Sequence, residues 1–395
     1  MNKKTVIFGA GQIGRGFIGD ICAAEGYFLV FVDVVPEVIN LLNKMGHYPL
    51  WILGEEKREK SINHLKAYHL SEKGNILFEL MDVSLVFTAV GANNLVSLSP
   101  LLAAHIEQRV REKPNSYLDI VICENLLQSA TVLRQSIEIH LTGPARQYLQ
   151  TNVGLVETVV SRMVAPLSEE QRKIQPLLVT VEPYCVLPVS RLSFKGGVPA
   201  IKAFYPVDNL VPYEELKLYG HNLTHAALAF LGWQKGYRFI WEAMEDESIA
   251  QIVSGVRKEA SEALIRAHRF ARAEVESYFD DLFARFKNRL LADTVTRVGR
   301  DPWRKLGPKE RIVGAINLCL NQGIFPDSIC LVAGACLCYN ETEDTQAQRV
   351  QSFLKEKGLD IFLTEVCGLE DRRVREKIKV AYQEMKNEGG HSEKR

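Results

Sequence analysis

The chain of 395 residues has no excess of charge of either sign. Lysine plus arginine and aspartate plus glutamate number 48 each, so the formal net charge at pH 7 is zero. Proteins that bind nucleic acid or anionic membranes through a broad surface usually carry a basic excess. The charge balance therefore gives no sign of either partner, and we expect neither.

Long apolar runs are also missing. No run approaches the roughly 20 residues that a membrane-spanning helix needs. The first apolar run, Thr5–Ala10, is broken at once by glycines and does not resemble the core of an export signal. We therefore expect a cytoplasmic protein without a membrane segment.

Paired metal-ligating patterns are absent as well. None of the eight cysteines forms a C-x-x-C pair, and Cys336 and Cys338 are too close together for a usual zinc knuckle. We expect reduced, buried thiols and no metal site. The cysteines are Cys22, Cys123, Cys185, Cys319, Cys330, Cys336, Cys338 and Cys367.

The chain has neither internal repeats nor low-complexity tracts, and its length allows two domains with separate cores. The glycines and proline of Lys195–Pro199 suggest a boundary, which we place between residues 198 and 199. Beyond Pro212 the apolar spacing is mainly helical. Before the boundary, residues 48–80 show little periodicity, whereas Gly154–Val164 and Leu177–Val181 are predicted to extend a sheet.

A glycine-rich turn links a predicted strand to a predicted helix near the start of the chain. The strand Lys4–Phe8 precedes the G-x-G-x-x-G sequence of Gly9–Gly14, and a second strand, Phe28–Val32, ends at Asp33. This order is typical of a dinucleotide-binding βαβ unit. The predicted class is α/β, with an N-terminal Rossmann-type doubly wound sheet followed by a mainly α-helical C-terminal domain.

Each residue of the turn has a separate expected role. Gly9 permits the tight turn, Gly11 lets the backbone approach a pyrophosphate, and Gly14 lets helix and strand pack closely. Gln12 and Ile13 lie where the helix begins, and the free N–H groups there favour phosphate. We therefore expect residues 1–198 to bind a dinucleotide.

The acid after the second strand predicts which dinucleotide binds. A carboxylate at Asp33 accepts hydrogen bonds from the adenosine ribose and repels a 2′-phosphate, so NAD is favoured over NADP. One later predicted strand ends at Ala89 and Val90, and another is followed by Glu124 and Asn125. Loops at such strand ends line the ligand crevice of doubly wound sheets. A role of Asn125 in a turn or cap fits the sequence equally well.

A second group of polar residues lies in a predicted helix from about Tyr213 to Phe230. At about 100° per residue, one arc of this helix carries Glu214, Lys217, His221, Asn222 and His225. The arc continues with apolar or small residues and should face inward, where polar groups are costly without partners. A partly solvated helix with a polar patch is the alternative.

Four cations lie between two later helical segments, around a glycine and a proline. They form a plausible phosphate clamp because guanidinium groups match phosphate oxygens. Taken alone, the stretch is better explained as a solvated basic loop. The cations are Arg297, Arg300, Arg304 and Lys305.

With these pieces together, the sequence resembles the mannitol dehydrogenase family of polyol-specific long-chain dehydrogenases over nearly its whole length. The most specific feature is the K-x-x-x-x-N-x-x-H pattern of Lys217, Asn222 and His225. Other matching stretches are Phe8–Gly19, Asp33–Val34, Thr88–Gly91, Cys123–Asn125, Glu182–Tyr184, Phe194–Gly196 and Arg297–Leu306.

The resemblance implies a metal-independent, NAD-linked oxidoreductase whose residues 199–395 bind substrate and carry the catalytic groups. It implies Lys217 as general acid/base, Asn222 as donor to the developing oxyanion, His225 as the group that orients the substrate oxygen, and Glu214 as a proton relay. The expected reaction interconverts a hexitol phosphate and a ketose phosphate, mannitol 1-phosphate and fructose 6-phosphate, in a monomer or small homo-oligomer.

Three positions depart from the family pattern and leave the sugar open: Ser161, Leu187 and Ser190. An unphosphorylated hexitol or a uronate is the alternative substrate, although the cations from Arg297 to Lys305 favour a phosphate. A protein that senses NAD without turnover is a third possibility. The joint presence of Lys217, Asn222 and His225 argues against it, because a sensor has no use for all three.

Overall fold

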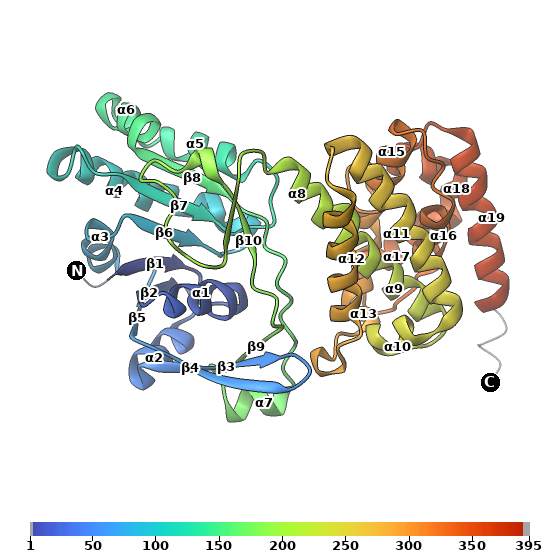
Figure 1. The fold of residues 1–395 in the computed structure, drawn as a ribbon, viewed down its shortest axis with the longest axis horizontal. Coiled ribbons are helices and arrows are strands. Elements are labelled where there is room, and N and C mark those ends of the chain that lie inside the picture. Colours follow the sequence, from blue (N-terminus) through green and yellow to red (C-terminus); the bar gives the residue numbers. More distant parts are fainter. Residues whose placement is uncertain (1–2, 390–395) are drawn as a thin grey trace. The chain divides into compact units, whose positions relative to one another are not determined.

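The computed structural model describes residues 3–389, which form two compact units divided between Leu210 and Val211 (Figure 1). The division lies later than the predicted boundary at 198/199. The Gly-Gly-Val-Pro stretch is a loop that leads into β11 (Phe204–Val207), and β11 pairs in parallel with β10 (Leu187–Ser190). This pairing keeps the segment with the first unit.

Six parallel strands form the central sheet of the first unit, in the order β5-β2-β1-β6-β7-β8. The order reverses between β1 and β6, and ligands of doubly wound sheets bind at the carboxyl edge of such a point. The predicted fold class is thereby confirmed. The strands are β1 (Lys4–Phe8), β2 (Phe28–Asp33), β5 (Leu65–His69), β6 (Leu85–Thr88), β7 (Leu118–Ile122) and β8 (Val153–Glu157).

Helices bury both faces of this sheet. Alternate side chains of β1 serve opposite cores, since Ile7 packs with one hydrophobic cluster while Val6 and Phe8 pack with the other. The cluster of Ile7 includes side chains from η1 (Gly14–Gly19), α1 (Asp20–Ala24) and α2 (Pro36–Met45). The other is covered by α3 (Lys73–Met81), η2 (Ala92–Leu98), α4 (Ser99–Glu112), α5 (Ser129–Glu138) and α6 (Gly143–Asn152).

A second sheet of the first unit lies where the sequence prediction was wrong. Residues 48–80 are not irregular, because β3 (His47–Leu53) and β4 (Lys57–Asn63) form an antiparallel hairpin. β9 (Val179–Val181) pairs with β3 and does not extend the central sheet. Proline and tryptophan on the outward face of β3 mask its alternation in the sequence. The remaining short elements of this unit are α7 (Glu169–Ile174) and η3 (Arg191–Ser193).

The second unit is mainly helical, as expected, and within the described residues its one β-bridge joins Phe239 and Thr294. Its elements are α8 (Val211–Glu215), η4 (Leu216–Asn222), α9 (Leu223–Gln234), α10 (Ile240–Glu245), α11 (Glu247–His268), α12 (Arg272–Phe286), η5 (Arg289–Leu291), α13 (Val295–Gly299), α14 (Pro302–Lys305), α15 (Val313–Asn321), α16 (Asp327–Cys338), α17 (Thr345–Lys357), α18 (Leu359–Ile361), η6 (Phe362–Val366) and α19 (Arg372–Gly389).

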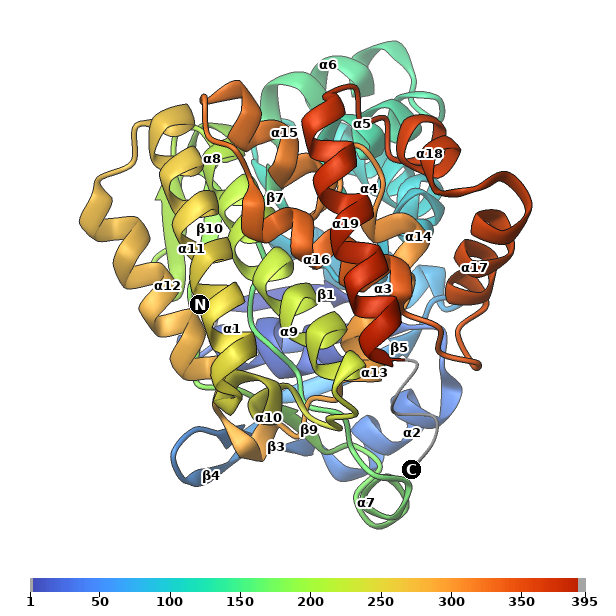
Figure 2. The same ribbon diagram turned by 90° about the vertical axis from the view of Figure 1, so that its right-hand side faces the viewer.

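The core of the second unit is built around α9 and α16. α9 is buried from Leu223 to Gly232 except at His225, and α16 is apolar on nearly all sides. α16 packs against α9, α11 and the C-terminal helix α19, which crosses it on the outside (Figure 2). Because nearly every side of α9 is enclosed, the polar side chains that it carries are held in fixed surroundings.

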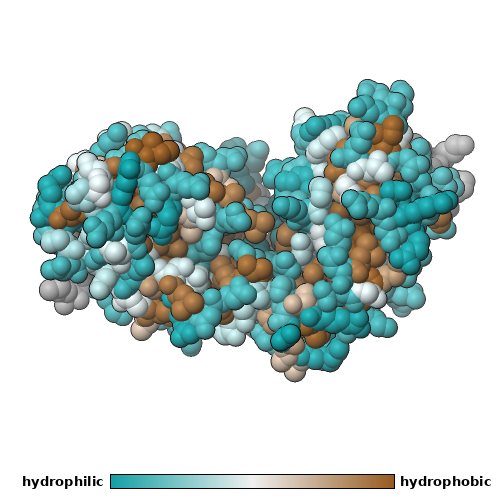
Figure 3. Space-filling view, turned by 90° about the horizontal axis from the view of Figure 1, so that it is seen from above, coloured by the Kyte–Doolittle hydropathy of each residue, from teal (hydrophilic) through white to brown (hydrophobic). Residues whose placement is uncertain are grey.

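Polar residues cover much of the surface of the two units (Figure 3), and their cysteines are unpaired. Hydrophilic residues dominate each unit on the face drawn in Figure 3. Among residues 3–389, no helix is both long and apolar enough to cross a membrane. The eight cysteines are free thiols, and burial raises the pKa of Cys123 and of Cys319 to about 12, so these two are unreactive.

Candidate active site

The glycine turn after β1 is packed too tightly for side chains at two of its positions. Gly9 has φ +100°, and its N–H donates to the carbonyl of Val32 at 2.7 Å. A Cβ on Gly9 would lie 2.2 Å from the carbonyl oxygen of Ala89, and one on Gly14 would lie 1.9 Å from that of Gly9. The close approach of β1, β6 and the following helix therefore requires glycine at both positions.

Gly11 differs, because a Cβ there would meet no heavy atom within 4 Å. It lies beside Gln12, which is exposed, and Ile13, which is partly buried, where the helix begins. This side of the turn is open to a ligand, and the backbone N–H groups at the start of a helix suit phosphate oxygens. The residues present thus fit a dinucleotide.

Asp33 is held beside this turn by backbone donors. Its Oδ2 accepts a hydrogen bond from the N–H of Ala10 at 2.5 Å, and its Oδ1 accepts from Val34 at 2.7 Å and Val35 at 3.0 Å. An ionised carboxylate has about four acceptor sites, so a position for a ribose hydroxyl remains. These hydrogen bonds therefore hold the end of β2 against the glycine turn.

The ends of β6 and β7 are joined by Glu124, which the sequence did not single out as a site residue. Its buried carboxylate accepts hydrogen bonds from the N–H groups of Val90 and Gly91, both at 2.8 Å. Burial raises the pKa of Glu124, and these two bonds oppose the rise. Ala89 and Val90 are thus fixed next to the glycine turn, and the exposed Asn125 follows at the same edge.

Two buried arginines brace the helix after the turn, and no local pattern predicts them. Arg15 donates from Nε to the carbonyl of Ala10 at 2.6 Å and from its guanidinium to the carbonyl of Leu177. Arg162 donates to the carbonyl of Gly16 at 3.1 Å and pairs with Asp20 at 2.7 Å. The contact of Arg15 with Leu177 and both contacts of Arg162 join segments that are distant in sequence.

In the second unit, Lys217, Asn222 and His225 lie on one continuous helix formed by α8, η4 and α9. The segment η4 is a π turn, in which the N–H of Leu223 donates to the carbonyl of Leu218, five residues earlier. In a regular α-helix Lys217 and Asn222 would lie about 140° apart, at the two edges of the predicted arc, but an i→i+5 turn brings residues five apart closer to one line. The π turn therefore moves Lys217 and Asn222 onto one face.

The surroundings of Lys217 favour its neutral form. Burial, together with the nearby charge of Arg311, lowers the pKa of Lys217 to about 8, although Glu214 opposes the shift. His221, one turn along, is buried, and desolvation lowers its pKa well below the usual 6.5. An amine with a pKa near 8 can accept a proton at neutral pH far more readily than an ordinary lysine.

His225 lies over an aromatic ring and beside a carboxylate. Its ring stacks on Phe286, with centroids 4.8 Å apart and an angle of 27°. Its Nε2 is 3.0 Å from Oδ2 of Asp293, a residue that belongs to none of the predicted site motifs. In the sequence, only the spacing of Asp293 four residues before Arg297 hints at an ion pair there.

Two of the four predicted phosphate-binding cations have carboxylate partners. Arg297 pairs with Asp293 at 2.6 Å. Arg304 pairs with Asp301 at 2.8 Å and with Glu310 at 3.0 Å. The stretch is also more ordered than a solvated loop, because it forms the short helices α13 and α14.

The other two predicted cations differ from each other. Lys305 is buried and donates to the carbonyl of Arg300, whereas the Arg300 side chain is exposed and makes no ion pair within the described part of the chain. Arg311 is a further cation that the sequence did not reveal. It is largely buried, and its charge, after burial itself, lowers the pKa of Lys305 to about 8. Lys217, Lys305 and Arg311 thus form a group of poorly hydrated cations.

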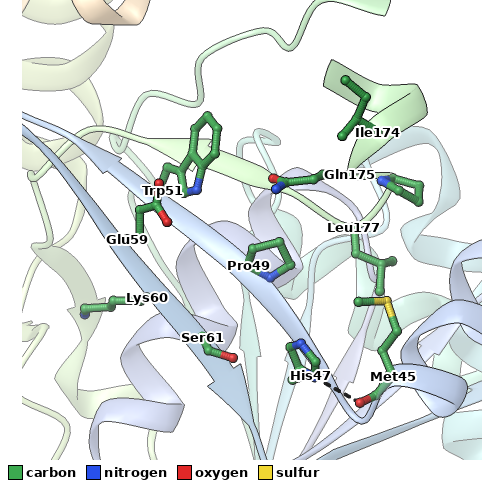
Figure 4. A pocket seen from close by; sticks show the side chains of 11 residues that line it. Met45, His47, Pro49, Trp51, Glu59, Lys60, Ser61, Ile174, Gln175 and Leu177 are labelled. Carbon is green, nitrogen blue, oxygen red and sulfur yellow. Dashed lines mark hydrogen bonds between the residues drawn. The ribbon is translucent and has the colours of Figure 1, made fainter. Parts of the chain in front are cut away.

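A cavity of about 540 Å³ lies elsewhere in the first unit, between the outward side of the β3–β4 hairpin and the segment before β9 (Figure 4). None of the predicted site residues lines it. Within residues 3–389, no group of three or more His, Cys, Asp and Glu side chains is placed to hold a metal ion. The cavity is lined by Met45, His47, Pro49, Trp51, Glu59, Lys60, Ser61, Ile174, Gln175, Pro176 and Leu177.

Each of the two units matches a domain of a known protein family. The family profile described as the mannitol dehydrogenase Rossmann domain matches residues 3–203, and the mannitol dehydrogenase C-terminal domain matches residues 209–386. The chain belongs to the mannitol dehydrogenase family. A relative from Geobacillus thermodenitrificans named mannitol-1-phosphate 5-dehydrogenase is 35% identical over 390 residues, covering 98% of this chain and 100% of its own. One of the same name from Bacillus subtilis is 33% identical over 364 residues, covering 92% and 95%.

Two solved structures of other dehydrogenases share the fold. The mannitol 2-dehydrogenase of Pseudomonas fluorescens, in a ternary complex with NAD and D-mannitol, gives a TM-score of 0.76 at 18% identity, covering 100% of this chain and 95% of its own. A substrate-free D-sorbitol dehydrogenase gives 0.78 at 16% identity, covering 98% and 94%. These likenesses concern the fold of the family and not its substrates.

The three departures from the family pattern lie in the first unit. Ser161 and Leu187 are buried, and the hydroxyl of Ser190 is 2.8 Å from that of Ser193. None of the three offers a negative charge. They therefore cannot supply a carboxylate to a sugar hydroxyl.

The glycine turn provides a matched pair of substitutions. Gly14→Ala should destabilise the protein by about 1–3 kcal/mol or more, because its Cβ would overlap a backbone oxygen. Gly11→Ala should change stability by less than about 0.5 kcal/mol. Urea unfolding of the two variants measures the difference. Equal losses would show that the turn is not packed as described.

Proposed function

We propose that this protein is an NAD-dependent oxidoreductase that interconverts a hexitol phosphate and a ketose phosphate, mannitol 1-phosphate and fructose 6-phosphate. The relatives named mannitol-1-phosphate 5-dehydrogenase support the substrate. The single observation that carries the chemistry is the lowered pKa of Lys217, on a helix that also carries Asn222 and His225. Balanced charge and free thiols suit a cytoplasmic monomer or small homo-oligomer.

The first unit is proposed to hold NAD, which accepts the hydride when bound. The open side of Gly11 suits the pyrophosphate, and the carboxylate of Asp33 suits a ribose hydroxyl. The proposed cofactor-binding residues are Gly9, Gly11, Gln12, Ile13, Gly14, Asp33, Ala89, Val90 and Asn125.

Lys217 is proposed to move the proton of the reacting hydroxyl. With a pKa of about 8, roughly a tenth of the amine is neutral at pH 7, compared with less than about a thousandth for a pKa of 10.5. The neutral amine accepts the hydroxyl proton during alcohol oxidation. The ammonium form returns a proton to the oxygen during carbonyl reduction.

The neighbouring side chains are proposed to assist Lys217. The Asn222 amide donates to the oxygen that gains negative charge, and such a bond is strongest where water is scarce. His225 orients the substrate oxygens. Glu214 is partly buried on the preceding turn, and its charge acts on Lys217. This position suits the proposed proton relay.

The substrate phosphate is proposed to bind the cations of α13, α14 and the segment that follows. Arg297 and Arg304 already share their charges with carboxylates, so Arg300 is the most available of the predicted group. Lys305 adds positive charge in poorly hydrated surroundings, and Arg311, also poorly hydrated, shares its charge with Glu310 at 3.2 Å. These groups favour a phosphorylated sugar over a free hexitol or a uronate, and a sensor without turnover would not need Lys217.

Replacement of Lys217 tests the proton transfer. Lys217→Ala should lower kcat by about 10²–10⁴-fold while NADH affinity stays unchanged. In the unmodified enzyme, oxidation should fall tenfold per pH unit below about pH 8, where the amine is protonated. Steady-state rates across pH provide the measurement, with the exposed Lys287→Ala as control. Near-normal turnover with an unaltered pH profile would show that Lys217 is not the acid/base.

Replacement of Asp33 tests the choice of cofactor. Asp33→Ala should reduce the preference for NAD over NADP by about ten- to a hundred-fold, because it removes a charged acceptor for the ribose. The ratio of kcat/KM for the two cofactors measures the preference. Glu37→Ala, which removes a nearby exposed carboxylate, should leave the ratio unchanged. An unmodified enzyme that uses both cofactors equally would contradict the role of Asp33.

Replacement of Arg300 tests the phosphate site. Arg300→Ala should raise KM for mannitol 1-phosphate about ten- to a hundred-fold, since one charge-assisted contact is lost. Arg304→Ala should have a smaller effect, because two carboxylates share its charge. Lys309→Ala removes an exposed charge nearby and serves as control. An unchanged KM in Arg300→Ala would place the phosphate elsewhere.

A further inference from the structure

Asp293 lies in a segment whose backbone is fixed on both sides. It follows Ala292, which has a left-handed conformation with φ 45°. The carbonyl of Asp293 accepts a hydrogen bond from the N–H of Ile240 at 2.9 Å, and the N–H of Val295 donates to the carbonyl of Arg238 at 3.0 Å. An alanine in this conformation costs free energy and persists only where its surroundings impose it. The position of Asp293 is therefore determined by the fold around it.

The Asp293 carboxylate serves one partner with each oxygen. Oδ1 accepts from Nε of Arg297 at 2.7 Å, and Oδ2 lies 3.0 Å from Nε2 of His225. Burial raises the pKa of Asp293, but the bonds and charges of His225 and Arg297 outweigh it and keep the pKa below the usual range. The group is therefore a carboxylate near neutral pH, and its side chain is only 10% exposed.

The contact between His225 and Asp293 has the length of a hydrogen bond but is not well aligned. Polar contacts in sites without substrate are often imperfect in this way. An ionised carboxylate can only accept hydrogen bonds. The Asp293 carboxylate would repel a lone pair on Nε2 of His225, whereas it attracts an N–H at Nε2.

Within residues 3–389, the other groups next to the His225 ring offer it no hydrogen bond, so the contact with Asp293 determines how the ring is oriented. Phe286 stacks on one face and has no hydrogen-bonding group, and the centroid of His221 is 5.7 Å away. The His225 side chain remains 13% exposed. The charged and titratable groups around His221 and His225 are Lys217, Arg285, Asp293, Arg297 and Arg311.

We propose that Asp293 is a positioning residue that holds His225 in the tautomer whose proton is on Nε2. The lone pair of Nδ1 then accepts a hydrogen bond from a substrate hydroxyl next to the reacting carbon. A hexitol carries such hydroxyls on the neighbouring carbons, so this bond fixes the sugar while Lys217 takes the proton. The inference rests on the proposed function, which assigns the substrate to His225.

A double-mutant cycle tests whether Asp293 acts through His225. Asp293→Asn has nearly the same shape, but its amide can donate to Nε2 and favour the other tautomer. It should lower kcat/KM for mannitol 1-phosphate about ten- to a hundred-fold, with unchanged NADH affinity and unchanged urea unfolding. In the His225→Ala background the same change should have little further effect, because the pair acts as a unit. Additive losses, or no loss in a folded Asp293→Asn variant, would overturn the proposal.

Nitrogen NMR of the unmodified protein gives a test that needs no variant to fold. With ¹⁵N-labelled histidine, His225 should show a protonated Nε2 and an unprotonated Nδ1 at pH 7.5, and His225→Ala assigns its signals. A proton on Nδ1 would overturn the proposal. If the enzyme does not turn over mannitol 1-phosphate, the proposed function fails, whereas the NMR result still decides the tautomer.

Discussion

The partial dehydration of one amine is the constraint on which the second unit depends. Lowering the pKa of Lys217 from 10.5 to about 8 corresponds to a cost on the order of 3 kcal/mol for keeping it charged in the folded protein. This cost is present in full below about pH 8 and disappears as the pH rises to 10.5. The apolar packing of α9, buried from Leu223 to Gly232 except at His225, offsets it. A surface helix could not hold Lys217 in this state.

The features that the sequence predicts well are those that depend on neighbours along the chain. Gly9 and Gly14 are required by contacts within one strand, turn and helix, so their spacing carries the information. Asp33 follows a strand that pairs directly with β1, and its carboxylate meets the same turn. The K-x-x-x-x-N-x-x-H pattern likewise marks the helix that carries Lys217. Local constraints of this kind fix both the fold class and the candidate residues.

The features that the sequence does not reveal depend on contacts between distant segments. The π turn of η4 is absent from any residue pattern, yet it decides which residues share a face with Lys217. Asp293 reaches His225 across many residues of chain, and Arg311 belongs to a run that reads as an ordinary charged surface. The β3–β4 hairpin was missed for a related reason, because the apolar Trp51 on its outward face hides the alternation. Such pairings need the fold before they can be seen.

The two units therefore control chemistry by different physical means. In the first, the absence of a Cβ at two glycines and two carboxylates held by backbone N–H groups, Asp33 and Glu124, define the proposed cofactor site. In the second, the site consists of titratable groups whose pKa values their neighbours set, as Arg311 does for both Lys217 and Lys305. A charge change there alters every coupled group, whereas salt screens only exposed members such as Arg300. Under the proposed function, single charge changes in the second unit should therefore alter substrate choice.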